Sequence, residues 1–234
     1  MQKFGKFLLL LNAIVFAGVA LSQSEASARS RDVGNFYLEG SFIPVWQTHN
    51  QYWSPAGGAL PGEADPGRES VAGLDARAIL GYAIHGRWLI GFSYNMYTAN
   101  TNRNGHEPKE GSTTITEYGP SLGVLFGGWK LIATYVMSSE WKYSMKYKNS
   151  SGILVSDQTY TNKEGSGFLI NFGYNFTLKP WLQIGPSLIY RSVEYAKGSL
   201  EDRTNPSNSY TDQTFSTKPL QAELQPYFSI VARF

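Results

Sequence analysis

The chain has 234 residues, of which 42% are hydrophobic, 15% aromatic and 16% charged, and it contains no cysteine. The aromatic content is too high and the charge too low for a disordered chain, and the lack of cysteine excludes disulfides, Cys-based zinc sites and thiol catalysis. A net charge of +2 gives no general attraction to nucleic acid. The mean hydropathy of −0.27 is that of a soluble protein, but a transmembrane barrel is apolar only at alternate positions, so its average is also polar.

Residues 1–28 have the pattern of an export signal. Two lysines in the first six residues precede an apolar run over 7–21. This run is shorter than the roughly 20 residues of a membrane-spanning helix, and small residues follow it, as in a cleaved secretory signal peptide. We predict cleavage after Ala28, with Ser22 as the second candidate position and an uncleaved anchor as the alternative. Residues 29–234 then form one domain.

The rest of the chain alternates between apolar and polar residues in eight segments, which is the pattern of strands with two different faces. The segments cover roughly residues 35–46, 71–84, 88–98, 114–126, 129–138, 167–176, 181–195 and 220–234. One face of each segment is rich in aromatic and aliphatic side chains, and the other is rich in Gly, Ser and Asn with a few charges. Small polar residues suit a narrow lumen and aromatic residues suit lipid, whereas a soluble sandwich carries its charge on the exposed face.

The connectors between these segments alternate in length. The short ones are predicted at 85–87, 127–128 and 177–180, and the long ones at 47–69, 99–111, 140–165 and 197–217. Bacterial outer-membrane barrels have short periplasmic turns and long outer loops. A tryptophan follows each short connector, at Trp88, Trp129 and Trp181, and indole rings prefer the membrane–water interface. We predict that these residues and Phe234 form a periplasmic aromatic girdle; the alternative is three unrelated core tryptophans.

The last ten residues, 225–234, alternate in polarity and end on an aromatic residue. They resemble the C-terminal assembly signal of Gram-negative outer-membrane proteins, with Phe228, Ile230 and Phe234 at outward positions. As a whole, residues 29–234 resemble the small eight-stranded barrels of the OmpA-transmembrane-domain, OmpX or OmpW type. This resemblance implies an all-β, antiparallel up-and-down transmembrane barrel in the bacterial outer membrane, with both chain termini in the periplasm. It also implies contact with the barrel-assembly machinery, with lipid and with lipopolysaccharide.

Four prolines interrupt the pattern at outward positions, namely Pro44, Pro120, Pro186 and Pro226. Proline has no backbone N–H, so each one removes a hydrogen bond from the ladder of a closed barrel. We predict β-bulges at these positions. The alternative is that several of the prolines lie on free strand edges and that the barrel is open.

Inward-facing charges are predicted at two levels of the lumen. The lower level contains Glu39, Lys130 and Arg233, and the upper level, near the outer mouth, contains Asp75, Arg77, Glu117, Arg191 and Glu223. Unpaired charges are costly in a low-dielectric lumen, so we expect opposite charges to pair. The interior of an eight-stranded barrel is filled by its own side chains, which favours a plug of salt bridges. A narrow gated ion path is the alternative.

The connector after the fifth segment continues to alternate. Ser139, Trp141, Tyr143, Met145 and Tyr147 extend the outward parity, and Lys142, Lys146 and Lys148 lie on the opposite face. Because about 9–11 residues span the membrane, we predict that the strand continues outside, turns near 149–152 and returns through 153–160 as a projecting hairpin. Its aromatic face is interpreted as a binding edge for a surface partner, or as an enlarged girdle against lipopolysaccharide sugars. The lysines are candidates for contacts with lipopolysaccharide phosphates.

Catalysis is not predicted. The three histidines, His49, His85 and His106, all fall in predicted loops, and the chain shows no Gly-rich phosphate loop and no metal-ligand spacing. We therefore expect no enzyme activity, cofactor or metal. The first hypothesis is a structural or surface-interaction barrel that acts through long outer loops. The alternatives are a narrow channel or OmpW-like transporter of small or hydrophobic solutes, and a soluble secreted β-protein.

Overall fold

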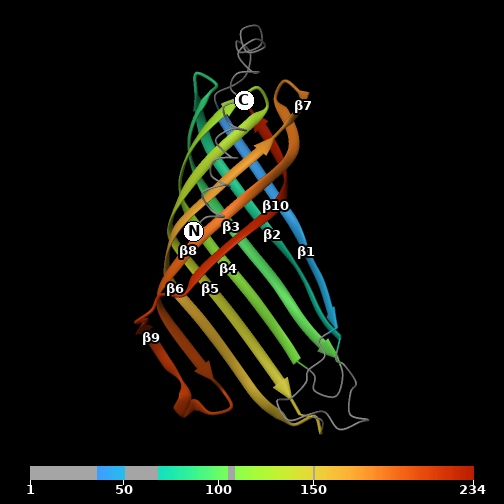
Figure 1. Cartoon of the computed structure of the whole chain (residues 1–234), viewed down its shortest axis with the longest axis vertical. Helices are drawn as coiled ribbons and strands as arrows, with labels where there is room; N and C mark the ends of the chain where they lie inside the picture. The colour runs from blue at the N-terminus through green and yellow to red at the C-terminus, as the bar shows by residue number, and fades with distance from the viewer. Residues whose placement is uncertain (1–35, 51–67, 105–108, 150) are drawn as a thin grey trace, which may run out of the picture.

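The computed structural model describes residues 36–50, 68–104, 109–149 and 151–234. The predicted signal peptide, residues 1–28, lies outside the described residues, and nearly all of the rest of the chain that is described forms strands (Figure 1). In these ranges, no helix has the length and apolar character that crossing a bilayer requires.

The strands form an antiparallel up-and-down ring. They are β1 (Phe36–Asn50), β2 (Arg68–Ile84), β3 (Trp88–Asn104), β4 (Lys109–Phe126), β5 (Trp129–Lys148), β6 (Leu154–Tyr174), β7 (Phe176–Lys179), β8 (Leu182–Asp202), β9 (Tyr210–Thr214) and β10 (Leu220–Arg233), with one 3-10 turn, η1 (Pro206–Asn208). The ring order is β1-β2-β3-β4-β5-β6-β8-β10, and β10 returns to β1. β7 pairs with β8 beyond the end of β6, and β9 pairs with the outer end of β8. The predicted eight-stranded barrel is therefore confirmed.

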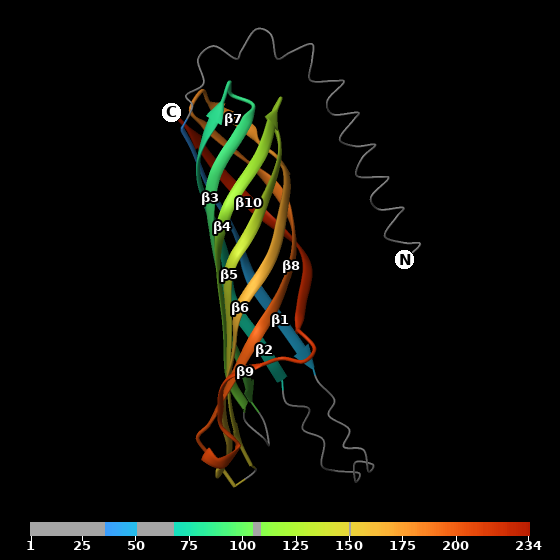
Figure 2. The ribbon, with the colours of Figure 1, turned by 90° about the vertical axis from the view of Figure 1, so that its left-hand side faces the viewer.

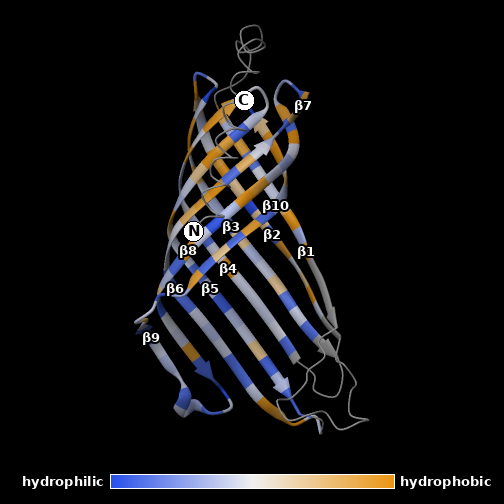
Figure 3. Cartoon of the chain, viewed as in Figure 1, coloured by the Kyte–Doolittle hydropathy of each residue, from blue (hydrophilic) through white to orange (hydrophobic). Residues whose placement is uncertain are grey.

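The two faces of the strands are also as predicted, because apolar side chains cover the outside and charges lie inside. Trp88, Leu122 and Tyr135 are 59%, 63% and 60% exposed, whereas Glu39 and Lys130 are 0% and 1% exposed. Figure 3 shows that the apolar residues are concentrated in the half of the barrel that holds the C terminus. A protein that folds in water has the opposite distribution.

The structure agrees with the predicted short connectors at two positions and differs from them at one. Gly127 and Gly128 have positive φ angles of 54° and 89°, as a two-residue hairpin turn requires, and the turn at 85–87 also lies as predicted. Residues 177–180, however, are mostly strand: β7 covers Phe176–Lys179, and the turn lies at Pro180 and Trp181.

The predicted long connectors are largely strand where the structure describes them. Residues 140–148 and 154–165 belong to β5 and β6, and 197–202 and 210–214 belong to β8 and β9. The strands over 140–148 and 154–160 confirm the predicted projecting hairpin with its turn near 149–152. The others were not predicted, because their polar side chains break the apolar alternation while the backbone continues to pair. Figure 2 shows these outer ends of the strands and β9 at the end of the molecule opposite to the C terminus.

Two of the four prolines lie beside interruptions within the sheet. The register of β4 against β5 shifts between Tyr118 and Ser121, on either side of Pro120, so the predicted bulge is confirmed there. Pro186 lies where β8 changes its pairing partner. In the direction of the start of β8, Ser187 is the last residue that pairs with β6, and Ile184 is the first that pairs with β7.

The other two prolines lie where β1 and β10 separate. Along the described lengths of both strands, pairing ends at Phe42–Phe228, although β1 continues to residue 50 and β10 begins at residue 220. In Figure 1, the two strands meet near the C terminus and diverge toward the outer end. We call β1 residues 43–50 and β10 residues 220–227 the β1–β10 seam.

The backbone chemistry of Pro44 and Pro226 explains why the seam begins where it does. Phe36 and Phe234 exchange both backbone hydrogen bonds, at 2.9 and 3.0 Å. Such hydrogen-bonded pairs recur at every second residue of an antiparallel ladder. The pair that would follow Phe42–Phe228 is therefore Pro44–Pro226, where both N–H donors are missing. The expectation of bulges is wrong at these two positions, which lie on free edges.

Candidate functional site

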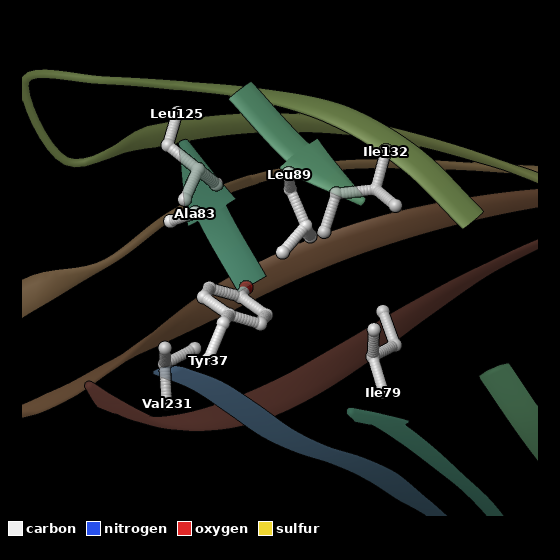
Figure 4. Close-up of a cluster of buried hydrophobic side chains, with 7 residues drawn as sticks. All are labelled: Tyr37, Ile79, Ala83, Leu89, Leu125, Ile132 and Val231. Carbon is white, nitrogen blue, oxygen red and sulfur yellow. The ribbon is translucent and has the colours of Figure 1, made fainter. Parts of the chain in front are cut away.

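One end of the lumen is closed by an apolar plug. This end carries the short turns and the C terminus, and we call it the periplasmic end, and the opposite end the outer end, after the predicted orientation. The plug consists of Tyr37, Ile79, Ala83, Leu89, Leu125, Ile132 and Val231 (Figure 4). These side chains come from six strands, and none is more than 8% exposed. The sequence interpretation missed the plug because near the periplasmic turns both faces of the strands are apolar, as in Ala78-Ile79-Leu80, and the alternation there assigns no polar lumen.

An ion pair crosses the lumen next to the plug. The Nζ atom of Lys130 donates to Oε1 of Glu39 at 2.6 Å, and Ser41 Oγ and Asn171 Nδ2 donate to the same oxygen at 2.7 and 3.0 Å. The hydroxyl of Tyr37 donates to the second carboxylate oxygen. Since β1 and β5 lie on opposite sides of the ring, this lower ion pair ties the two walls together.

The arginines of the lower lumen bind neutral partners. Arg77 was expected at the upper level, but its Nε donates to Ser93 Oγ at 2.9 Å and its guanidinium NH2 group to Thr134 Oγ1 at 2.5 Å. Arg233 donates to the carbonyl oxygen of Gly86 at 3.1 Å. The salt bridges of the described chain include neither arginine, so the structure does not bring them into the predicted ion pairs.

The upper level centres on Arg191. Its NH2 group donates to Oε1 of Glu117 at 2.6 Å, and its NH1 group donates to Oε1 of Glu223 at 2.9 Å. Asn95 and Ser139 each donate to Glu117 at 3.2 Å. Because Glu117 is on β4 and Arg191 is on β8, this network also crosses the lumen.

A cavity of about 310 Å³ lies above the upper level, and we call it the outer vestibule. It is lined by Val45, Tyr97, Thr113, Ile115, Trp141, Gln221, Glu223 and Gln225. Tyr97, Ile115 and Trp141 are register partners on neighbouring strands, so they form a continuous row of one wall. The facing polar residues come from β10, on one side of the β1–β10 seam.

The predicted outward parity of the hairpin is wrong because β5 contains a bulge. The register of β5 against β6 shifts between Val136 and Ser139 and again before Trp141. Ser139 is therefore 1% exposed inside the lumen, and the ring of Trp141 packs against Tyr195, with centroids 6.0 Å apart. Tyr143 and Tyr147 share the parity of Trp141 because no further shift separates them. The exposed face instead carries Lys142, Lys146 and Lys148.

Outside the ring, Asp202 organises the turn between β8 and β9. Its Oδ1 accepts the backbone N–H groups of Asn205 and Thr204 at 2.9 and 3.0 Å, and its Oδ2 accepts Gln158 Nε2 at 2.8 Å. The bonds from Asn205, Gln158 and Thr204 stabilise the carboxylate and lower the pKa of Asp202. The sequence interpretation missed this order because the connector has no apolar periodicity.

The residues of the predicted girdle lie at the periplasmic end. Trp88, Trp181 and Phe234 are 59%, 45% and 65% exposed, and the rings of Trp181 and Phe234 stack at 6.3 Å. Trp129 is half-buried and stacks on Phe172 at 5.2 Å. Of the predicted assembly signal, Phe228 and Ile230 also point outward, each 42% exposed.

The histidines do not assemble a site in the described part of the chain. His85 is exposed in the β2–β3 turn with a φ of 51°. His106 lies outside the described residues, as does the side chain of His49. Over the described ranges, no group of three or more His, Cys, Asp or Glu residues could hold a metal ion.

Comparisons with known proteins find similarity only in structure. No protein-family model matches the chain, and no curated protein matches it. Neisserial surface protein A is 13% identical, with a TM-score of 0.36, over 87% of this chain and 100% of that one. Ail of Yersinia pestis, crystallised with the heparin analogue sucrose octasulfate, is 8% identical (TM-score 0.39; 86% and 97%). The outer membrane protein OprG of Pseudomonas aeruginosa is 11% identical (TM-score 0.33; 86% and 96%).

Proposed function

We propose that this chain is an integral outer-membrane β-barrel that is closed to solutes and acts at the outer surface. The observation that carries this proposal is the arrangement of its two faces. The apolar face points outward around the ring, and the lumen is crossed by the Glu39–Lys130 ion pair beside the apolar plug. Hydrocarbon is the solvent that such an outside requires, and a lumen filled at this level leaves no aqueous path.

The height of the apolar surface supports this orientation. The outward apolar positions of β3 run from Trp88 to Met96 and then give way to Thr98 and Asn100. Nine residues fit the roughly 9–11 that a tilted strand needs to cross a bilayer. The short turns and the C terminus lie at one end of this band and the long strand extensions at the other, which corresponds to periplasm and exterior.

The outer ends of β5, β6 and β8, with β9, form a wall that we infer to be the interaction surface. Lys142 is exposed on its outer face, and Lys146 is 3.8 Å from Asp157 with a 52% exposed side chain. These lysines follow the outward apolar residue Met137 along β5, so they stand at the height of lipopolysaccharide phosphates. Ammonium groups bind phosphate as point charges, which makes lipopolysaccharide the proposed partner of this wall.

Two sets of measurements test the proposal, one for the membrane assignment and one for the closed lumen. The signal-free protein refolded into vesicles should resist extraction by carbonate and migrate anomalously on unheated gels, because a closed sheet resists detergent. In planar bilayers it should show no steady conductance, and liposomes that contain it should not swell in sugar solutions. A monodisperse folded protein in plain buffer would refute the membrane assignment, and swelling at the rate of a general porin would refute the closed lumen.

A second candidate function is a lateral route for hydrophobic solutes. The observation that favours it is the β1–β10 seam, which opens the outer half of the ring beside the vestibule. An apolar fluorophore such as N-phenylnaphthylamine should then enter proteoliposomes faster than protein-free vesicles. A disulfide between Val45→Cys and Gln225→Cys should abolish the difference, and an unchanged rate would exclude this route.

A further inference from the structure

The charges of the lumen are separated along the barrel axis. The lower lumen contains Lys130, Arg77 and Arg233 against Glu39, and the upper level contains Asp75, Glu117 and Glu223 against Arg191. Arg77 belongs to the lower group because it donates to Ser93. Ser93 and Glu39 are both register partners of Ile79, so they lie at the same level of the sheet. The lumen is therefore neutral as a whole, but its outer level has two more negative charges than positive ones.

The carboxylate of Asp75 is only partly satisfied. It is 2% exposed and Tyr227 hydrogen-bonds to it, but its Oδ1 atom has no hydrogen-bond partner among the described residues. Arg191 lies within electrostatic range of Asp75, but its NH1 and NH2 groups already donate to Glu223 and Glu117. A buried carboxylate with one oxygen unpaired and no salt bridge of its own costs free energy, so this position attracts positive charge.

Asp75 does not itself line the outer vestibule, but its neighbour on β3 does. Asp75 is the register partner of Tyr97, and the row continues through Ile115 to Trp141. Tyr97 lies within electrostatic range of both Asp75 and Glu223. The side chain of Glu223 is 30% exposed, so a molecule in the vestibule reaches its carboxylate from solvent.

The dimensions and the lining select the class of ligand. A cavity of about 310 Å³ is at the lower end of the range for small-molecule sites. The described carboxylates do not converge as metal ligands. The aromatic rings of Tyr97 and Trp141 offer the electron-rich faces that attract organic cations, and Val45 and Ile115 offer contacts for a carbon skeleton.

We propose that the outer vestibule is a binding site for a small organic cation, an amine or quaternary ammonium compound. Its charge lies toward Asp75 and Glu223, and its carbon skeleton lies against Tyr97 and Trp141. This binding activity goes beyond the structural and surface roles proposed above. It requires only the folded barrel and not a particular membrane partner.

Calorimetric titration of the folded full-length barrel, in a neutral maltoside detergent, tests this proposal. The probe is choline, and the matched control is 3,3-dimethylbutan-1-ol, which has the same shape with carbon in place of the charged nitrogen. Choline should bind saturably and about tenfold more tightly than the neutral alcohol. Equal affinity for both molecules would overturn the proposal, and so would displacement of choline by an equal concentration of Mg²⁺.

Substitutions locate the site. Asp75→Asn and Glu223→Gln keep the shape of each side chain and should each weaken choline binding several-fold, whereas Glu201→Gln, on the exposed outer surface, should leave it unchanged. Heat-modifiable gel migration shows whether each variant is folded. In the indole N–H region of the NMR spectrum, the signal absent from Trp141→Phe should move on addition of choline. Binding that is unaltered in both carboxylate variants, or an unmoved Trp141 signal, would place the ligand elsewhere and refute the proposal.

Discussion

The periplasmic and outer halves of this barrel are built from the same strands but differ in how the sheet closes and how the lumen is filled. In the periplasmic half, β1 and β10 pair along their length, and seven apolar side chains fill the lumen. The buried Glu39 accepts hydrogen bonds from Lys130 and four further donors. In the outer half, the same two strands separate, Trp141 lies between a second apolar cluster and a cavity, and Asp75 has an oxygen without a partner in the described part of the chain. Buried polar atoms that lack a partner among the described residues occur in both halves, so the halves differ chiefly in backbone closure, and the comparison shows that the cavity lies where β1 and β10 separate.

The largest expected effect comes from breaking the lower ion pair. Lys130→Met leaves Glu39 buried without its cation, and removing one partner of a buried pair costs about 3–5 kcal/mol. The free energy of unfolding of the barrel in lipid vesicles, measured by urea titration, should fall by this amount. In the double variant Glu39→Gln with Lys130→Met, most of the loss should be recovered because no charge remains. A single variant as stable as the parent would show that the pair does not hold the periplasmic half together.

The prolines of the seam give the next effect. Pro44→Val together with Pro226→Val restores two N–H donors, each worth about 0.5–1.5 kcal/mol once bonded, and should extend the ladder beyond Phe42–Phe228. Val45→Cys and Gln225→Cys report on this extension, because the continued register makes them neighbours at roughly 4.5 Å between Cα atoms, within disulfide reach.

The chain has no cysteine of its own, so only the introduced pair can react. The disulfide should form faster in the valine background than with the prolines in place. Ser41→Cys with Ser229→Cys is the positive control, since the two hydroxyl oxygens are 2.8 Å apart in the paired part. Equal rates in both backgrounds would mean that the prolines do not keep the seam open.

A smaller effect is expected when low pH protonates Asp202 at the turn between β8 and β9 and loosens that turn. The pKa of Asp202 is lowered by the hydrogen bonds from Asn205, Gln158 and Thr204. The stabilisation is thus fully present above the ordinary carboxyl pKa of about 3.9 and is lost as the pH falls through the lower folded value. Amide exchange of Thr204 and Asn205 should accelerate at this acidic end, while the lumen amides remain protected. Asp202→Ala should show fast exchange already at neutral pH, and protection retained at low pH would contradict the assigned role.

The smallest effect is expected for a surface ion pair of the same wall. Lys163 donates to Asp212 at 2.9 Å, with side chains 38% and 52% exposed. Water and salt screen such pairs, so Lys163→Gln should leave the urea midpoint unchanged within error. A loss comparable to that of Lys130→Met would remove the distinction between the buried lower pair and the outer wall.

The alternation of the chain was sufficient to predict the ring, its two faces and the turns at 85–87 and 127–128, because side chains of a strand alternate whatever its neighbours are. It also predicted that β5 continues to a turn near 149–152 and that a strand returns from there. It did not predict that β6 is continuous or that β8 reaches Asp202, because these outer parts pair through the backbone without an apolar face. The bulge before Ser139 was also missed, and that single shift reversed the predicted orientation of Trp141.

For the candidate site, the sequence placed Glu39, Lys130, Glu117, Arg191 and Glu223 inside, and the structure joins them into two ion-pair networks. It could not tell that Arg77 binds hydroxyls rather than a carboxylate, since partners across a lumen depend on the relative heights of strands far apart in the chain.

By itself, the sequence determined which side chains face outward and which inward on the strands before the β5 bulge, and it located two prolines without N–H donors on the first and last strands. Only the tertiary structure decided that Pro44 and Pro226 fall opposite one another, because the register between β1 and β10 depends on the stagger accumulated around the whole ring. The same stagger places Tyr97, Ile115 and Trp141 opposite Gln221, Glu223 and Gln225 of β10 around the cavity. The β1–β10 seam and the outer vestibule thus depend on how the whole ring of strands is assembled, which no single strand encodes.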